Sequence, residues 1–313
     1  MNPLPTKQVY LGIALAVLAT IVWSGNFVVA RGVAEKIQPV SLAFYRWATA
    51  SLIMLPLAYK KFSEEKAVIL KNKNYIFWIS LTGVTLFNTL VYFAGHFSPA
   101  INLALIGTTS SPVMSIILAA IFLSERITVL RTIGLLLCIA GIVYLIAQGS
   151  WGRLMAFHFS KGDILILVAA FTFAVYNILV RRKPAGISPV NFLFVIFTAG
   201  ALLLLPFFIR ENFNSTAVVW DRNILLIILY LGLGTSVISY LCWNAAIARL
   251  GAARTALFGN LIPIFASLEA VWFLGEKITM VHIISGSTVI AGLVIANLEA
   301  KRSNEKKKEG KRV

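Results

Sequence analysis

The feature that most constrains this chain is a succession of long apolar runs joined by short polar connections. Each run has the roughly 17 to 25 residues that a helix needs to cross a bilayer. Because a backbone inside hydrocarbon must satisfy its own hydrogen bonds, we expect an all-α membrane protein with ten transmembrane helices. The ten runs lie at approximately 9–30, 39–59, 75–96, 99–123, 129–147, 162–180, 189–209, 223–246, 252–274 and 280–298.

The composition supports this interpretation. Hydrophobic residues make up 59% of the chain and charged residues only 13%, about half the charged share of a typical soluble protein. The formal charge of +16 comes from short connections and from the end of the chain, without the interleaved aromatics of a nucleic-acid surface. We therefore expect a lipid bilayer as partner and no nucleic acid.

The basic residues also predict an orientation. With a cytoplasmic N-terminus, the connections richest in lysine and arginine, 60–73, 181–183 and 301–313, all fall on the cytoplasmic side. Membrane proteins keep such residues on that side. The sequence therefore predicts that both the N- and C-termini are cytoplasmic, which is consistent with an even number of spans, since that number places both termini on one side.

The second half of the chain repeats the first at an offset of 150 or 151 residues. The segment Glu125–Thr128, thirteen residues after Pro112, matches Glu276–Thr279, thirteen residues after Pro263. Because each half holds five helices, the second half must insert upside down. We expect a first five-helix repeat at 1–150, an inverted second repeat at 151–300 and a basic cytoplasmic tail at 301–313.

Two inverted repeats are a transporter architecture, because similar halves can alternate as gates around a central site. We therefore predict a secondary transporter that works by alternating access at a cavity between the repeats. A channel or a scaffold could share the layout.

Several short motifs carry a resemblance to a known family. They are Trp23–Phe27, Phe44–Trp47, Gly162–Leu165 and the two hairpins Phe122–Glu125 and Phe273–Glu276. In this order, and partly duplicated, they resemble the EamA type of the drug/metabolite transporter superfamily over about 1–300. The resemblance implies ten helices, transport of small metabolites, often export, and a location in the bacterial inner (cytoplasmic) membrane.

A polar stripe marks the predicted cavity. Side chains three or four residues apart lie on one helical face, and such a stripe recurs in the third and eighth spans. It could form hydrogen bonds between helices, but we favour a cavity lining. The stripe contains Thr85, Asn88, Thr89, Tyr92 and His96, matched by Ser236, Ser239, Tyr240, Trp243 and Ile247.

Two charged residues lie inside spans. Glu269, whose repeat partner is Leu118, could carry a coupling proton or receive a substrate ammonium, or it could pair with an internal cation. Arg46 could bond carbonyls or pair with a carboxylate, and its guanidinium fork also suits a substrate carboxylate. Both stay candidates for handling charge.

Asn26 and Asn177 occupy equivalent places in the two repeats, with Trp23 one turn before Asn26. They could form edges of the site or pack helices. In the hairpins, Glu125 and Glu276 are interpreted as hydrogen-bond partners of nearby helix termini. The candidate substrate-binding residues are Trp23, Asn26, Asn88, Tyr92, Asn177, Tyr240 and Trp243.

The candidate substrate is a small molecule, with export of amino acids or related compounds as the first expectation, suggested mainly by the resemblance. Nucleotide sugars or drugs are the alternative. A membrane-embedded enzyme is disfavoured, since no acidic pair or activated nucleophile lies in the spans. Cys138 and Cys242 lack metal-ligand spacing, so no cofactor is expected. The sequence leaves monomer and homodimer open.

Overall fold

The computed structural model describes residues 6–124, 128–150, 152, 155, 160–214, 218, 220–250, 255 and 258–309. Within these ranges the chain is helical and contains no strand. Glu125 lies outside the described residues, so its predicted role at a helix terminus stays a prediction.

Continuous helices form most of the bundle. They are α1 (Thr6–Gly32), α2 (Pro39–Lys71), α5 (Ala100–Leu123), α6 (Val129–Ile146), α8 (Lys161–Arg181), α9 (Pro189–Asn214), α13 (Ile262–Leu274), preceded by the short turn η3 (Gly259–Leu261), and α14 (Met280–Glu309). α2 continues twelve residues past the predicted end of its apolar run at 59.

The third and eighth predicted spans are each interrupted by a π-helical stretch. The third consists of α3 (Lys73–Ser80), η1 (Leu81–Leu86) and α4 (Phe87–Gly95). The eighth consists of α10 (Arg222–Leu229), η2 (Tyr230–Ile238) and α11 (Ser239–Leu250). The two interruptions begin almost one repeat apart.

Among the described residues, 7 helices are long and apolar enough to cross a membrane. Three shorter apolar helices, Thr132–Ile146, Gly259–Leu274 and Met280–Ile295, coincide with the fifth, ninth and tenth predicted runs. An all-helical membrane bundle is therefore what the chain forms, and the crossing of these three segments stays a prediction.

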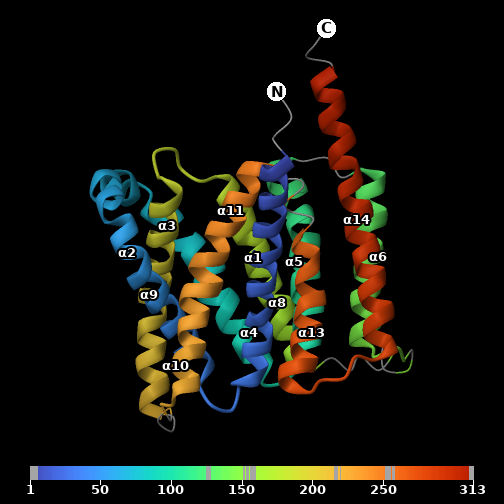
Figure 1. Ribbon diagram of the computed structural model, residues 1–313, viewed down its shortest axis with the longest axis horizontal. Coiled ribbons are helices and arrows are strands. Elements are labelled where there is room, and N and C mark those ends of the chain that lie inside the picture. Colours follow the sequence, from blue (N-terminus) through green and yellow to red (C-terminus); the bar gives the residue numbers. More distant parts are fainter. Residues whose placement is uncertain are drawn as a thin grey trace.

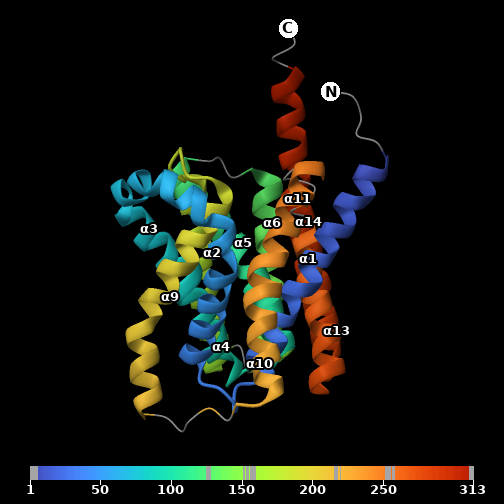
Figure 2. The ribbon, with the colours of Figure 1, turned by 60° about the vertical axis from the view of Figure 1, so that its left-hand side comes forward.

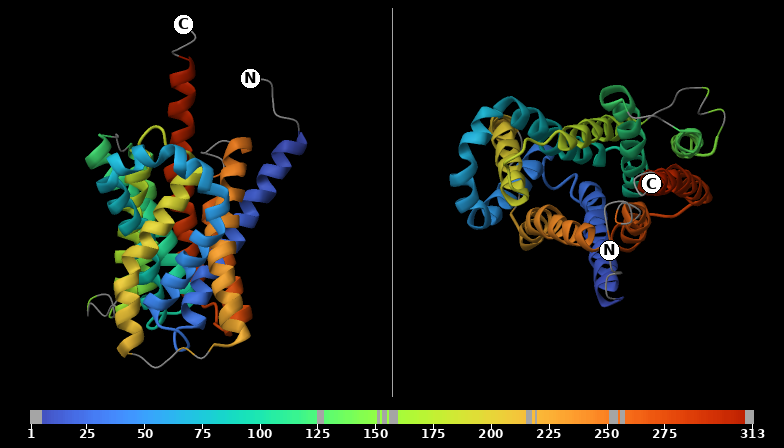
Figure 3. Two further views of the ribbon diagram at one scale, coloured as in Figure 1. Left: turned by 90° about the vertical axis from the view of Figure 1, so that its left-hand side faces the viewer. Right: turned by 90° about the horizontal axis from the view of Figure 1, so that it is seen from above.

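The start of α1 and the end of α14 lie at the same end of the bundle, which we call the terminal end (Figure 1). The connections 33–38 and 96–99 lie at the opposite end, which we call the far end (Figure 2). The helices of the two predicted repeats interleave: α1 packs on α11 and α13, while α8 packs on α4 and α5. α2 pairs with α9 on one side of the bundle and α6 with α14 on the other (Figure 3).

α6 and α14 approach closely through small residues. The Ser285 hydroxyl donates to the Gly141 carbonyl at 2.6 Å, and the Cys138 thiol to the Val289 carbonyl at 3.6 Å. A Cβ added at Gly292 would lie 2.6 Å from the carbonyl oxygen of Gly134. Small residues that let backbones touch are the usual basis of helix packing in membranes, and here they join helices of one chain.

Two carboxylates hold helix N-termini at the far end. Glu211 on α9 accepts the backbone N–H of Ser41 at 2.6 Å and of Val40 at 3.2 Å. Glu276 accepts the backbone N–H of Ala100 at 2.7 Å. The first amides of a helix have no partner within the helix and favour a negative charge, so the interpretation of Glu276 as a partner of a helix terminus is confirmed.

A corresponding contact lies at the terminal end. Glu65 on α2 accepts the backbone N–H of Ser188 at 2.9 Å and the amide of Asn191 at 2.7 Å, just where α9 begins. The end of α2 thus holds the start of α9, as the end of α9 holds the start of α2.

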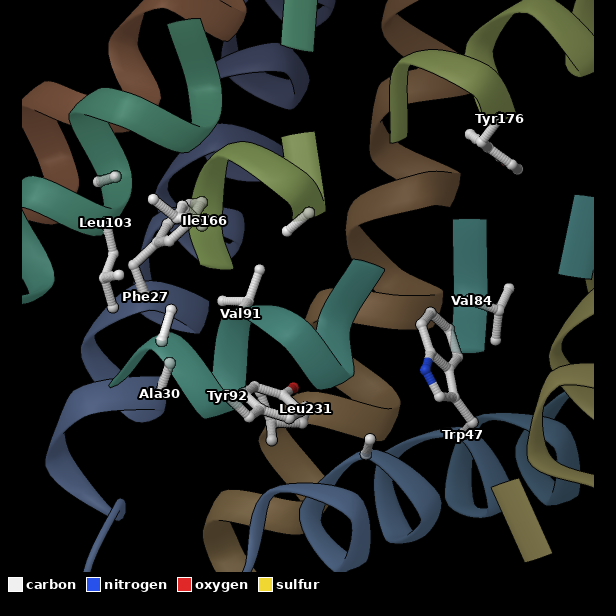
Figure 4. Close-up of a cluster of buried hydrophobic side chains, with 14 of the residues drawn as sticks. Phe27, Ala30, Trp47, Val84, Val91, Tyr92, Leu103, Ile166, Tyr176 and Leu231 are labelled. Carbon is white, nitrogen blue, oxygen red and sulfur yellow. The ribbon is translucent and has the colours of Figure 1, made fainter. Parts of the chain in front are cut away.

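Apolar side chains fill the places where the two sets of helices meet. Leu103 and Ile166 are fully buried and Phe27 nearly so, and they gather where α5, α8 and α1 adjoin (Figure 4). α5 packs on both α1 and α8 and so helps to position these two helices, which border the cavity described next.

Candidate transport cavity

The cavity begins beside a buried arginine on α2. The Arg46 Nη1 donates to the Asn26 Oδ1 at 2.6 Å, to the Asn88 Oδ1 at 2.7 Å and to the Tyr92 hydroxyl at 3.0 Å. Its Nε donates to the Ser236 hydroxyl at 2.9 Å. Four partners from α1, α4 and η2 therefore fix the guanidinium, which is only 4% exposed.

The π-helical turns help to make this arrangement. In η2 the Ser236 hydroxyl donates to the Leu231 carbonyl five residues earlier and so presents its oxygen to Arg46. The Thr235 carbonyl accepts the indole N–H of Trp23 at 2.9 Å. π-helical turns often occur at functional sites because they displace backbone groups. Apart from glycines in the two spans, nothing in the sequence indicated these turns.

Arg46 is a buried cation without a buried anion. Across the described part of the chain its partners are amide and hydroxyl oxygens, and its Nη2 makes no hydrogen bond. The guanidinium lies 4.6 Å from the centre of the Trp47 ring. Removing a charge from water is costly unless a counter-charge and hydrogen bonds replace the water. The arrangement is therefore one that an incoming anion would complete.

The cavity adjoining Arg46 has a volume of about 570 Å³, within the range of small-molecule sites. The rings of Trp23 and Tyr240 meet edge to face with centroids 5.4 Å apart, and Trp243 lies 5.1 Å from Trp23. Aromatic surface thus dominates one wall. Other lining residues are Asn26, Phe27, Trp47, Gly83, Phe87, Asn88, Gly107, Thr108, Ser111, Pro112, Phe173, Tyr176, Asn177, Val180, Gly259, Asn260 and Ile262.

The lining residues show which way the cavity extends. Arg46 lies seven residues after the far-end start of α2, whereas Val180 and Gly259 lie at the terminal-end limits of α8 and α13. At the far end, Arg31 donates to the Gly95 carbonyl at 3.1 Å, and the carboxylates of Glu211 and Glu276 hold helix starts. The cavity therefore reaches toward the terminal end and stops short of the far end.

Most of the predicted site residues meet in this cavity. Among the candidate substrate-binding residues, Tyr92 does not line it, since Tyr92 is 1% exposed and supports Arg46 and Asn26 from behind. The predicted cavity lining by the polar stripe is confirmed for Asn88, Tyr240 and Trp243, but Thr85, Thr89, His96, Ser236, Ser239 and Ile247 do not line the cavity. Asn177 donates to the Ser115 hydroxyl at 3.2 Å and is not part of the arginine cluster. The predicted residues that line the cavity are Trp23, Asn26, Arg46, Asn88, Asn177, Tyr240 and Trp243.

Glu269 lies elsewhere. Its Oε1 accepts the Ser24 hydroxyl at 2.7 Å, and its side chain lines a separate groove bordered by Gly25 and Tyr230. α1 carries Trp23 and Asn26 toward the cavity and Ser24 and Gly25 toward Glu269. The carboxylate is therefore not in place to receive an ammonium in the cavity, and it forms no ion pair with a described residue.

Five aromatic lining residues were not predicted as site residues from the sequence: Phe27, Trp47, Phe87, Phe173 and Tyr176. All except Phe173 directly follow or precede a predicted site residue, which is the only signal that pointed to them. A Cβ at Gly83 of η1 would lie 2.1 Å from a ring carbon of Tyr176, so the Tyr176 ring occupies its place because position 83 has no side chain. In the described residues no group of three or more potential ligands could hold a metal ion.

A bundle of apolar helices around a closed-ended, aromatic cavity defines the chain as a multi-pass membrane transporter by class. The profile of the EamA-like transporter family matches residues 10–147 and again 160–298. The chain belongs to this family, within the drug/metabolite transporter superfamily.

Curated relatives carry similar names. The chain is 26% identical over 294 residues to the "Uncharacterized transporter YyaM" of Bacillus subtilis, covering 92% of this chain and 94% of that protein. It is 27% identical over 289 residues to a "Probable amino-acid metabolite efflux pump" of Salmonella typhimurium, covering 90% and 93%. A solved crystal structure shares the fold, with a TM-score of 0.63 at 17% identity over 95% of this chain and 99% of the other.

Proposed function

We propose that this protein is a secondary transporter that exports amino acids or related small metabolites across the bacterial inner membrane, by alternating access at the central cavity. One observation carries the proposal: Arg46 lines that cavity, and its guanidinium Nη2 has no hydrogen-bond partner among the described residues. The carboxylate of an amino acid is the anion that would complete it, since a guanidinium binds carboxylates through paired N–H groups.

The rest of the cavity suits the rest of such a substrate. Trp23, Tyr240 and Trp243 offer apolar surface to a side chain, and their ring faces attract an ammonium. No aspartate or glutamate occurs among the described lining residues, so aromatic faces and the oxygens of Asn177 and Asn260 would receive the amine. The relatives named as amino-acid metabolite efflux pumps support this class of substrate.

The topology belongs to the same proposal. Two inverted five-helix repeats would relate positions 134, 138 and 141 to 285, 289 and 292. The contacts between α6 and α14 are reciprocal in this sense, since Gly141 meets Ser285 and Gly292 meets Gly134. With ten spans and both termini cytoplasmic, the cavity would be reached from the cytoplasm, as an exporter requires for loading.

The test is counterflow of labelled amino acids into liposomes that contain the purified protein, with protein-free liposomes as control. The panel would contain phenylalanine, leucine, methionine, threonine and cysteine. We expect saturable exchange of at least one of them. If none moves while the protein keeps its thermal unfolding transition, the amino-acid proposal is wrong, and nucleotide sugars and drugs are tested next.

The coupling of Glu269 to a proton stays a separate proposal. If this carboxylate carries the coupling proton, a pH gradient stimulates exchange in the unmodified protein and has no effect in Glu269→Gln. Stimulation that survives the substitution would assign the carboxylate to another role. The topology is tested by attaching green fluorescent protein to the C-terminus. The attached protein is fluorescent only if the C-terminus lies in the cytoplasm.

A further inference from the structure

A second cavity lies on the other face of α1 from the transport cavity. It is a groove of about 570 Å³ between α1, α10 with the start of η2, and α13. We call it the lateral groove. Its walls are almost entirely apolar, and Lys36, which is exposed, stands at its far-end mouth. The apolar lining is Ile21, Val22, Val28, Val29, Val33, Leu226, Ile227, Phe273 and Leu274.

Glu269 is the one acidic residue among the described residues that line the lateral groove. Its Oε1 accepts the Ser24 hydroxyl, but its Oε2 is shielded from water and has no hydrogen-bond partner. The neighbouring Tyr230 hydroxyl is not available, because it donates to the Val22 carbonyl at 2.6 Å. A buried carboxylate oxygen without a donor is costly, and a bound cationic N–H group would remove that cost.

The approach to Glu269 depends on a glycine. A Cβ added at Gly25 would lie 2.2 Å from the Tyr230 hydroxyl oxygen and 3.4 Å from the Glu269 Oε2. Gly25 itself lines the groove. The missing side chain therefore lets α1, η2 and α13 meet around the carboxylate without covering it.

We propose that the lateral groove binds a monovalent amphipathic amine, with the ammonium on Glu269 and the apolar body along the wall of valines and leucines. The charge of Glu269 and the apolar character of the walls are complementary to such a molecule. A neutral lipid chain fits the walls but not the carboxylate, and an anionic amphipath is repelled by it. The site is separate from the one that contains Arg46, and it does not depend on the proposed amino-acid substrate.

The test compares three molecules with the same apolar body: 4-phenylbutylamine, 4-phenylbutanol and 4-phenylbutyrate. Equilibrium binding of each, in radiolabelled form, is measured on the purified full-length protein in lipid nanodiscs. We expect the amine to bind at least tenfold more tightly than the alcohol. In the Arg46→Gln variant, whose transport cavity has lost its carboxylate partner, we expect the carboxylate to bind more weakly than both. Equal binding of amine and alcohol would mean that the groove only accepts lipid-like chains, and would overturn the proposal.

Two variants locate the binding. Glu269→Gln keeps the size of the side chain and loses the charge, so the preference for the amine should fall about tenfold. Val29→Phe leaves the carboxylate in place and fills part of the groove, so it should weaken the binding of all three molecules. The Arg46→Gln variant should bind the amine normally even where it loses amino-acid exchange, which separates this site from the transport cavity. A preference for the amine that survives both groove substitutions would contradict the proposal.

Discussion

Arg46 on α2 and Asn26 on α1 are joined by a hydrogen bond of 2.6 Å from the guanidinium Nη1 to the amide Oδ1. The bond ties the cation to the helix that also carries Trp23 of the aromatic wall. An amide oxygen stabilises the guanidinium without neutralising it, so the positive charge is retained for a ligand. The choice of asparagine over aspartate at position 26 is therefore central to the account.

Replacing Asn26 by aspartate should abolish amino-acid exchange and leave the fold intact. The new carboxylate would lie at hydrogen-bond distance from Arg46 and pair with it, so the substrate carboxylate would lose its partner. We expect exchange to fall at least tenfold while the thermal unfolding midpoint stays the same or rises. Asn72→Asp, at the junction of α2 and α3 away from the cavity, is the matched control and should exchange normally.

Gly83→Ala should damage the cavity through Tyr176. The added methyl would meet the Tyr176 ring at 2.1 Å, and overpacking of this kind costs about 1–3 kcal/mol. We expect a lower thermal unfolding midpoint and a higher KM for exchange. In a Tyr176→Ala background the ring is absent, so Gly83→Ala should lower the unfolding midpoint no further than Tyr176→Ala does alone. If Gly83→Ala alone keeps the unfolding midpoint and the KM of the unmodified protein, the Tyr176 ring can move aside at no cost and this prediction is wrong.

Gly292→Ala should destabilise the pair formed by α6 and α14 without changing the cavity. The new Cβ would lie 2.6 Å from the Gly134 carbonyl oxygen, so the two helices must separate, at a cost of about 1–3 kcal/mol. Gly286→Ala on the same helix is the control, because its nearest neighbour, Leu105, is 3.6 Å away. Thermal unfolding should distinguish the two variants, whereas the KM for exchange should be unchanged in both.

The carboxylates of Glu211 and Glu276 should stabilise the conformation in which the cavity is closed at the far end. Glu211→Gln and Glu276→Gln remove charged acceptors from the starts of α2 and α5, each worth about 1.5–3 kcal/mol. A Thr108→Cys reporter in the cavity, with Cys242 replaced by alanine, should then react faster with an impermeant thiol reagent added from the far-end side. If the rate from that side is unchanged, these contacts do not hold the far end closed.

Much of the fold could be predicted because a backbone inside the bilayer must satisfy its own hydrogen bonds, which in this chain means helices. The limits of α5 and α6 agree with the predicted apolar runs to within a residue or so. The extension of α2 to Lys71 could not be read from hydropathy, because its last turns are polar and leave the apolar stretch. The π-helical turns escaped prediction because they depend on how Gly83 and Gly232 pack against other helices.

The site was only partly predictable, because a polar residue inside a span shows that it needs a partner but not which one. Arg46 and Glu269 looked equally exceptional in the sequence. The structure places α1 between them, with Asn26 facing one and Ser24 facing the other. Adjacent positions on one helix thus serve two cavities. Tyr92 fitted the predicted stripe, but its face of α4 is covered by the arginine cluster.

The most direct test is whether Arg46 recognises the carboxylate of the substrate. In liposomes, exchange of the amino acid that the protein transports best is measured with an excess of the same unlabelled compound, or of its amide, as competitor. The amide keeps the ammonium and replaces the carboxylate by a neutral carboxamide. We expect the unmodified protein to favour the carboxylate by roughly 10- to 150-fold, the equivalent of one charge-assisted interaction of about 1.5–3 kcal/mol. Arg46→Gln should lose that preference, and Arg46→Lys should recover part of it. An Arg46→Gln protein that exchanges amino acids with the carboxylate preference intact would contradict the account.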